Sequence, residues 1–287
     1  MAAYQNLYWW SNDGLRLHAR DYPGGDGGGR PPILCLPGLT RNARDFDGLA
    51  ARLAGRWRVI ALDFRGRAES AYAKDAMTYV PLTYVQDVAA LLAAQSIDRY
   101  VAIGTSLGGI VTMLLAGAGS GGIAGAVLND IGPEIEAAGL ARIRGYVGKA
   151  SAFPTWEHAA RHLAGSQGDI YPDWAIEDWL AMAKRLYRLN GAGRVVLDYD
   201  LKIAEPFRAA GAEAGPDMWR ALSGLRTVPT AVVRGGRSDV LSATTADRMA
   251  ATLDRGLLAT VPSVGHAPLL TEPEAQEAID ALLGRVL

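Results

Sequence analysis

Short apolar runs alternate with longer amphipathic stretches along most of this chain. The runs at 33–36, 59–62, 100–103 and 122–130 read as buried strands. Stretches with helical patterning lie between them, near 43–54, near 80–95 and after residue 106. Because strands that alternate with helices are typical of βαβ units, the pattern predicts an α/β fold with a mostly parallel twisted sheet.

The two ends of the chain extend this sheet. Residues 6–10 and 15–21 are predicted strands joined by "SNDG", whose Asp-Gly pair favours a hairpin turn, so an amino-terminal antiparallel hairpin is expected. The Gly- and Pro-rich segment 22–32 is a connector. Strands at 230–233 and 257–261, with helices near 242–254 and 272–286, complete the alternation.

The alternation stops between residues 132 and 225. That segment has no convincing strand, shows helical patterning, and holds four of the seven tryptophans: Trp156, Trp174, Trp179 and Trp219. We therefore predict a helical cap at 132–225, inserted into a core domain made of 1–131 and 226–287. Cap aromatics are typical of a small module's own core, but some should face the cleft below, and Trp156, Trp174 and Trp179 are the expected substrate contacts.

Composition narrows the choice of partner. The chain has 287 residues, of which 49% are hydrophobic, which is enough for a substantial core. Its 29 basic and 30 acidic residues give a net charge of −1, so no excess field attracts nucleic acid or anionic lipid. The expected partner is a small, largely uncharged molecule.

Cysteine use and the amino-terminal sequence indicate a compartment. Cys35 is the only cysteine, which excludes an internal disulfide and a cysteine-based metal cluster. The start of the chain lacks the basic region and long apolar run of a signal peptide, and no later segment approaches a membrane span. We expect a soluble cytoplasmic protein.

The stretch "VAIGTSLGG" at 101–109 carries the strongest chemical signal. A strand that enters Gly-x-Ser-x-Gly and leaves as a helix is the context of a nucleophile elbow. Ser106 would sit on a tight turn at the carboxyl edge of the sheet, while Gly104 and Gly108 lack β-carbons that would collide there. The helix that follows would point its free N–H groups at charge developing on an attacked carbonyl.

These residues resemble the α/β-hydrolase family. Further similar segments are "CLPGLT" at 35–40, "LDFRGRAES" at 62–70, "RGGRSDVLS" at 234–242 and "SVGHAPLLTEP" at 263–273. The resemblance implies that the N–H groups of Leu39 and Leu107 form an oxyanion hole, that His266 is the general base, and that Asp239 is the acid. Arg67 and Ala68 depart from the family, which usually has His and Gly at these positions.

The chemistry requires such a trio in any case. A serine hydroxyl is a weak nucleophile near neutral pH, so a base must take its proton and a carboxylate must orient that base. The order Ser106, Asp239, His266 is the order that hydrolases of this fold use. Asp130, which ends the strand at "LND", is the alternative acid.

Other polar residues receive structural interpretations. His158 and His162 have the i, i+4 spacing of a metal pair, but "EHAARH" lacks the glutamate of the H-E-x-x-H motif, so no metal is expected. Asp63, at the end of a strand, is interpreted as a carboxylate that braces a loop.

The sequence therefore predicts a serine carboxylesterase without a cofactor, acting on an ester with an apolar acyl or alcohol part. Alternatives on the same triad are a carbon–carbon bond hydrolase of ring-fission products, a lactonase and a haloperoxidase-like enzyme. Thr105 stands where carbon–carbon hydrolases usually have Asn, and Ser106 disfavours epoxide and haloalkane hydrolysis, which use aspartate. A ligand-binding protein on a hydrolase fold is the alternative outside the enzymes.

Overall fold

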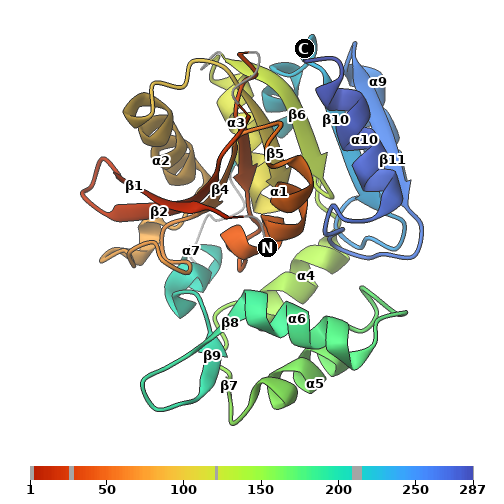
Figure 1. The fold of residues 1–287 in the computed structure, drawn as a ribbon. Coiled ribbons are helices and arrows are strands. Elements are labelled where there is room, and N and C mark those ends of the chain that lie inside the picture. Colours follow the sequence, from red (N-terminus) through yellow and green to blue (C-terminus); the bar gives the residue numbers. More distant parts are fainter. Residues whose placement is uncertain (1–2, 26–28, 120–121, 209–214, 287) are drawn as a thin grey trace.

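The computed structural model describes residues 3–25, 29–119, 122–208 and 215–286. An eight-stranded sheet in the order β1-β2-β4-β3-β5-β6-β10-β11 runs through the main body of the molecule (Figure 1). Its strands are β1 (Gln5–Trp10), β2 (Arg16–Tyr22), β3 (Ile33–Leu36), β4 (Val59–Asp63), β5 (Tyr100–Thr105), β6 (Ile123–Asn129), β10 (Thr230–Gly235) and β11 (Gly256–Val261).

The register of the sheet confirms the predicted fold class. β2 is antiparallel to both β1 and β4, whereas the six strands β4, β3, β5, β6, β10 and β11 are parallel to one another. The amino-terminal hairpin therefore adds an antiparallel edge to a parallel sheet. Carboxyl ends of parallel strands meet at one edge of such a sheet, so residues that follow β5 and β6 come close together there.

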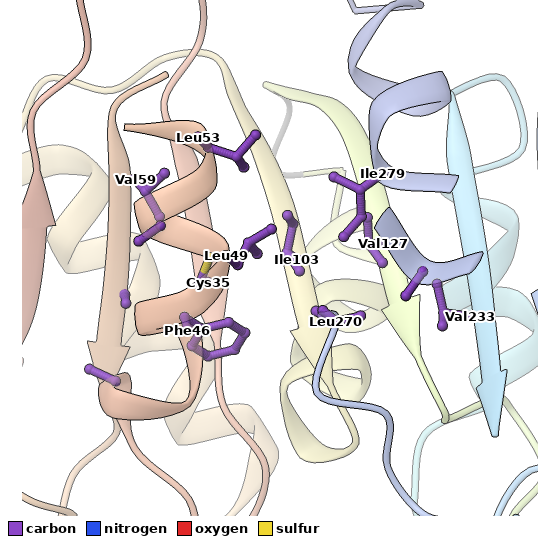
Figure 2. Close-up of a cluster of buried hydrophobic side chains, with 14 of the residues drawn as sticks. Cys35, Phe46, Leu49, Leu53, Val59, Ile103, Val127, Val233, Leu270 and Ile279 are labelled. Atoms are coloured by element: carbon purple, nitrogen blue, oxygen red, sulfur yellow. The ribbon is translucent and has the colours of Figure 1, made fainter. Parts of the chain in front are cut away.

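Helices cover both faces of the sheet. α1 (Asp47–Leu53) and α10 (Pro273–Leu283) pack on one face, where Leu49 and Ile279 lie over Ile103 and Val127 (Figure 2). The other face carries α2 (Pro81–Ala94), α3 (Leu107–Gly117) and α9 (Ala243–Thr252). The inner strands β3 to β6 are buried on both sides, which explains why they read as continuous apolar runs.

The segment between β6 and β10 differs in part from its prediction. Its helices are α4 (Ala137–Tyr146), α5 (Trp156–Gln167), α6 (Ile176–Leu186) and α7 (Glu205–Arg208). A three-stranded sheet accompanies them, formed by β7 (Ala152–Phe153), β8 (Tyr187–Leu189) and β9 (Val195–Leu197), so the expectation of a segment without strands is wrong. These strands have two or three residues, too few to show an alternating pattern.

The last helix of that segment belongs with the main sheet. α8 (Met218–Ser223) places Ala221 and Leu222 in a cluster with Met113 and Leu114 of α3. A β-carbon on Gly224, directly after α8, would lie 2.5 Å from the Ala116 carbonyl carbon. The helices thus touch through small residues, and α8, although within 132–225, packs on the core.

Candidate active site

Ser106 occupies a sharp turn between β5 and α3. Its backbone has φ 52° and ψ −114°, a combination that residues other than glycine rarely adopt. A β-carbon on Gly104 would lie 2.4 Å from the Gly108 carbonyl, and one on Gly108 would lie 2.0 Å from the Leu36 carbonyl oxygen. Only glycine fits at these two positions, so the local sequence permits the tight turn at the serine.

Three side chains form a hydrogen-bonded chain at the carboxyl edge of the sheet. Ser106 Oγ lies 3.0 Å from His266 Nε2, and His266 Nδ1 lies 2.8 Å from Asp130 Oδ2. His266 is 8% exposed and Asp130 is fully buried. When Nδ1 carries the ring proton and donates it to Asp130, Nε2 is free to accept the serine proton, which is the arrangement of an activated nucleophile.

Asp130 is held in place from the neighbouring strand. Its Oδ1 accepts from the Gly235 N–H at 2.8 Å, and its Oδ2 also accepts from the Ser238 hydroxyl at 2.7 Å. Its own N–H donates to the Val233 carbonyl at 2.7 Å. With every carboxylate oxygen hydrogen-bonded, the buried charge is stabilised and its orientation toward His266 is fixed.

The expectation that Asp239 orients His266 is wrong in this structure. Asp239 instead accepts two hydrogen bonds from Arg142 of α4, at 2.5 Å from Nε and 2.7 Å from Nη2. These bonds from the Arg142 guanidinium hold the pKa of Asp239 below its usual range. The sequence left Asp130 open as the alternative, but the competing partner of Asp239 lies 97 residues away and gave no local signal.

The two predicted oxyanion donors, Leu39 and Leu107, belong to two segments that lie next to Ser106. A β-carbon on Gly38 would be 3.8 Å from Ser106 Cβ, so the loop that carries Leu39 passes directly beside the nucleophile. Leu107 is the first residue of α3, and N–H groups in the first turn of a helix have no acceptor within the helix. Leu39 also lines the same cavity as Ser106, and the oxyanion role of both N–H groups stays a prediction.

A buried arginine, Arg67, forms a hydrogen bond to the loop that carries Leu39. Arg67 is fully buried, and its Nε donates to the Leu39 carbonyl at 2.9 Å. Its Nη1 donates to the Arg65 carbonyl at 2.6 Å and to the Tyr84 hydroxyl at 2.9 Å. Among the described residues no carboxylate pairs with this guanidinium. Sequence reasoning noted Arg67 only as a departure from the family, and its contact with the loop was missed.

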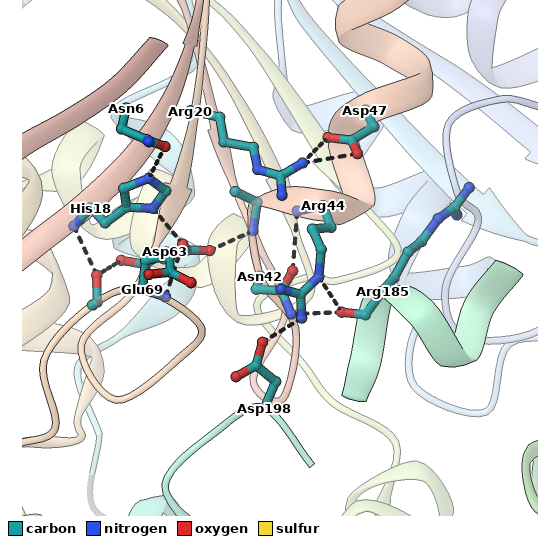
Figure 3. A network of polar contacts seen from close by, with 12 residues as sticks. Asn6, His18, Arg20, Asn42, Arg44, Asp47, Asp63, Glu69, Arg185 and Asp198 are labelled. Atoms are coloured by element: carbon teal, nitrogen blue, oxygen red, sulfur yellow. Dashed lines mark hydrogen bonds and ion pairs between the residues drawn. The ribbon is translucent and has the colours of Figure 1, made fainter. Parts of the chain in front are cut away.

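Asp63 braces the next part of the same loop, as its position predicted. Its Oδ1 accepts from the Ala43 N–H at 2.7 Å, and its Oδ2 lies 2.6 Å from His18 Nδ1 (Figure 3). In the same network Asn42 and Arg44 both donate to the Arg185 carbonyl at the end of α6 (Figure 3). The loop is thus tied both to the sheet and to the segment between β6 and β10.

That segment also holds the loop that carries His266. The Gly265 N–H donates to the Ile170 carbonyl at 2.8 Å, and the Tyr171 hydroxyl donates to the Ala267 carbonyl at 2.6 Å. Burial raises the pKa of Tyr171 well above its ordinary value. The imidazole is therefore fixed on both sides, by Asp130 and by its own backbone.

Ser106 and His266 open into a cavity of about 470 Å³ between the sheet edge and this segment. That volume lies within the range of small-molecule sites. The aromatic lining comes from tyrosines and one phenylalanine: Phe46, Tyr146, Tyr171, Tyr187 and Tyr199. Its other apolar walls come from aliphatic side chains such as Ile143 and Leu163.

The three tryptophans expected at the substrate lie elsewhere. Trp179 is only 3% exposed and packs against Trp174, whose ring stacks on Tyr171 with centroids 3.9 Å apart. Trp156 is packed against the same apolar cluster. None of Trp156, Trp174 and Trp179 lines the cavity, because their rings form the core of the segment itself.

His158 and His162 are the pair whose spacing in the sequence raised the question of a metal site. His158 lies 2.8 Å from the Thr155 hydroxyl, and His162 packs against Phe153 with ring centroids 5.0 Å apart. Within the described ranges, no three His, Cys, Asp or Glu side chains converge as a metal ion would require. Nor does any described helix have the length and apolar content needed to cross a bilayer.

Comparison with known proteins relates this chain to hydrolases. The model of the "Alpha/beta hydrolase family" matches residues 33–279. A 3-hydroxybutyrate-oligomer hydrolase of Cupriavidus necator is 35% identical over 254 residues, which cover 86% of each chain. The crystal structure of an alpha/beta hydrolase from Novosphingobium aromaticivorans is 58% identical, covers 99% of each chain and superposes with a TM-score of 0.94.

A putative hydrolase from Rickettsia typhi is a more distant structural match, 27% identical, with a TM-score of 0.85 and 99% of each chain covered. The family match includes the serine turn, Asp130 and the loop of His266. The fold, the sequence matches and the structural neighbours agree, and this chain belongs to the alpha/beta hydrolase family.

Proposed function

We propose that this protein is a serine hydrolase that cleaves carboxylic esters through an acyl-enzyme intermediate. The observation that carries the proposal is the hydrogen-bonded chain from Ser106 Oγ through His266 to Asp130. In serine hydrolases such a chain removes the serine proton as the oxygen attacks a carbonyl carbon. Its position at the floor of a cavity supports a small-molecule substrate.

In the first step Ser106 Oγ bonds to the ester carbonyl carbon while His266 Nε2 takes the serine proton. The negative charge on the carbonyl oxygen is stabilised by the N–H groups of Leu39 and Leu107 and by the start of α3. The imidazolium that forms is stabilised by Asp130. His266 then returns the proton to the alcohol oxygen as the carbon–oxygen bond breaks, which leaves an acyl group on Ser106.

Water completes the cycle by the same route in reverse. His266 takes a proton from a water molecule, the hydroxide oxygen attacks the acyl carbon, and the serine leaves with the proton. The steps use the substrate, one water molecule and residues of this chain. A cytoplasmic location stays a prediction from the sequence.

The substrate is an ester with an apolar acyl or alcohol part, because aliphatic and aromatic side chains make up much of the cavity wall. The Cupriavidus relative is named as a hydrolase of 3-hydroxybutyrate oligomers, whose units are short hydroxyacids joined by ester bonds. We therefore include short hydroxyacid esters in the proposal.

Hydrolysis of 4-nitrophenyl butyrate tests the proposal directly. Wild-type protein should release 4-nitrophenol, and Ser106→Ala should lose about three or more orders of magnitude in kcat while keeping its urea midpoint. A serine-directed fluorophosphonate should label Ser106 alone. Full retention of activity in Ser106→Ala, or labelling of that variant, would refute the nucleophile assignment, and an inactive wild type would favour a binding protein.

A further inference from the structure

The charged side chains around the cavity are not balanced. Three cationic residues line it, Arg41, Arg142 and Lys149, against one carboxylate, Asp45. The whole chain has a net charge of −1, so this local excess is not visible in composition. What each cation is bonded to decides whether it can act on a ligand.

Arg41 is neutralised within the wall. Its Nε and Nη2 donate to the two oxygens of Asp45 at 2.5 and 2.7 Å, and Nη2 also lies 3.0 Å from the sulfur of Met182. A bidentate pair of this kind satisfies the donors that face the carboxylate and cancels the charge. Arg41 therefore offers the cavity a polar surface rather than a free positive charge.

Arg142 is neutralised in the same way. Its Nε and Nη2 bond to both oxygens of Asp239, which stands just outside the cavity wall. If these two nitrogens of Arg142 bound a substrate carboxylate instead, the negative charge of Asp239 would be left without its partner. Arg142 is thus committed to the link between α4 and the loop after β10.

Lys149 is different. It lies in the turn after α4, where Gly148 has φ +77° and its backbone approaches Ala204 so closely that a β-carbon would be 2.5 Å from the Ala204 β-carbon. The Lys149 N–H donates to the Tyr146 carbonyl at 3.2 Å, which fixes the turn. Across the described part of the chain, no carboxylate lies within 4.0 Å of its ammonium group.

We propose that Lys149 binds a carboxylate on the substrate, so that the preferred esters are those of short hydroxyacids that end in a free carboxylate. This rests on the proposed ester hydrolysis and adds its substrate class. Lys149 is exposed and lines the cavity, and it is the lining cation whose charge no described residue cancels, so a substrate carboxylate can pair with it without losing all of its hydration. The apolar walls would then receive the acyl part while the charge stays at Lys149.

The test compares two substrates of similar shape, the anion 3-(butyryloxy)butanoate and its neutral primary amide. Both release butyrate, which chromatography quantifies in the same way. Wild type should prefer the anion, and Lys149→Met should lower the ratio of kcat/KM values, anion over amide, about threefold to fivefold at about 0.02 M salt, because Lys149 is exposed. The wild-type preference itself should shrink at about 0.5 M salt, because screening weakens an exposed charge pair.

Two further variants make the comparison specific. Lys149→Arg keeps the charge and should keep the ratio. Lys184→Met removes an exposed lysine of α6 that does not line the cavity, and should also keep the wild-type ratio. Urea midpoints of all variants confirm that they are folded to the same extent.

The outcomes separate the two proposals. If wild type fails to hydrolyse 4-nitrophenyl butyrate as well as both test esters, the proposed ester hydrolysis fails. If the esters are hydrolysed but wild type does not prefer the anion, or Lys149→Met keeps the full preference, the role of Lys149 is refuted and ester hydrolysis stands. A loss of preference in Lys184→Met equal to that in Lys149→Met would likewise overturn the assignment.

Discussion

Replacing Asp130 by Asn tests whether the negative charge of Asp130 orients and stabilises His266 in the proposed mechanism. Asn keeps the shape of the side chain and an oxygen that can still accept from the Gly235 N–H. Its amide group would occupy the place of Oδ2, which now accepts from both His266 Nδ1 and Ser238. Because an amide N–H donates, Nδ1 would become an acceptor and the ring proton would move to Nε2, where it blocks proton transfer from Ser106.

The expected loss follows from this change of tautomer and from the missing negative charge. The corresponding substitution in a serine protease lowers kcat by about four orders of magnitude, or about 5.4 kcal/mol at about 1.36 kcal/mol for each factor of ten. We expect Asp130→Asn to lose about two to four orders in kcat/KM for 4-nitrophenyl butyrate. Nitrogen-15 chemical shifts of the His266 ring should report the proton on Nε2.

Asp239→Asn is the matched control. Its carboxylate is about one-third exposed and is paired with Arg142, and ion pairs of this exposure contribute about 0–1 kcal/mol. Activity should therefore fall less than about tenfold. If Asp130→Asn stays within tenfold of wild type while Asp239→Asn loses a hundredfold or more, the hydrogen bond in the structure is not the one used in catalysis, and Asp239 is the acid.

Three further changes probe the surroundings of the site. Trp179→Ala should lower the free energy of unfolding by about 3 kcal/mol or more, because this side chain is 3% exposed; an unchanged urea midpoint would contradict its place in the core. Arg67→Met, which removes the donor to the Leu39 carbonyl, should lower kcat by about tenfold or more with a smaller change in KM, whereas an unchanged kcat in folded protein would refute a positioning role. The ion pair of Asp239 with Arg142 stabilises the fold above the ordinary pKa of the carboxyl, and this contribution is lost as the pH falls through its lowered pKa. Urea midpoints of wild type and Asp239→Asn should thus differ at neutral pH, and the difference should shrink as the pH falls below about 4; a constant difference would argue against the pair.

The sequence by itself determined the features that depend on neighbours along the chain. Apolar runs predicted the strands of the main sheet, because a strand buried on both faces must be apolar throughout. The turn at Ser106 was predictable because Gly104 and Gly108 must lack β-carbons for it to form. His266 was identified because the segment 263–273, between the last strand and the last helix, resembles a segment of the α/β-hydrolase family.

The predictions about the segment between β6 and β10 failed where its sequence pattern was weak or ambiguous. Strands of two or three residues, such as β7, cannot show an alternating pattern. Trp174 and Trp179 are equally consistent with a cleft wall and with the core of a small module, since aromatic side chains suit both environments. Only packing shows that these two rings stack within the core.

The choice between Asp130 and Asp239 belongs to the tertiary structure alone. Both residues follow strands that lie side by side in the sheet, and in the sequence each has the right type and a suitable position. The difference lies in their partners: Arg142 of α4 takes both oxygens of Asp239, while the Gly235 N–H and Ser238 hold Asp130 toward His266. A carboxylate bonds to the donors that the fold brings within about 3 Å, and residues far apart in the sequence supply those donors.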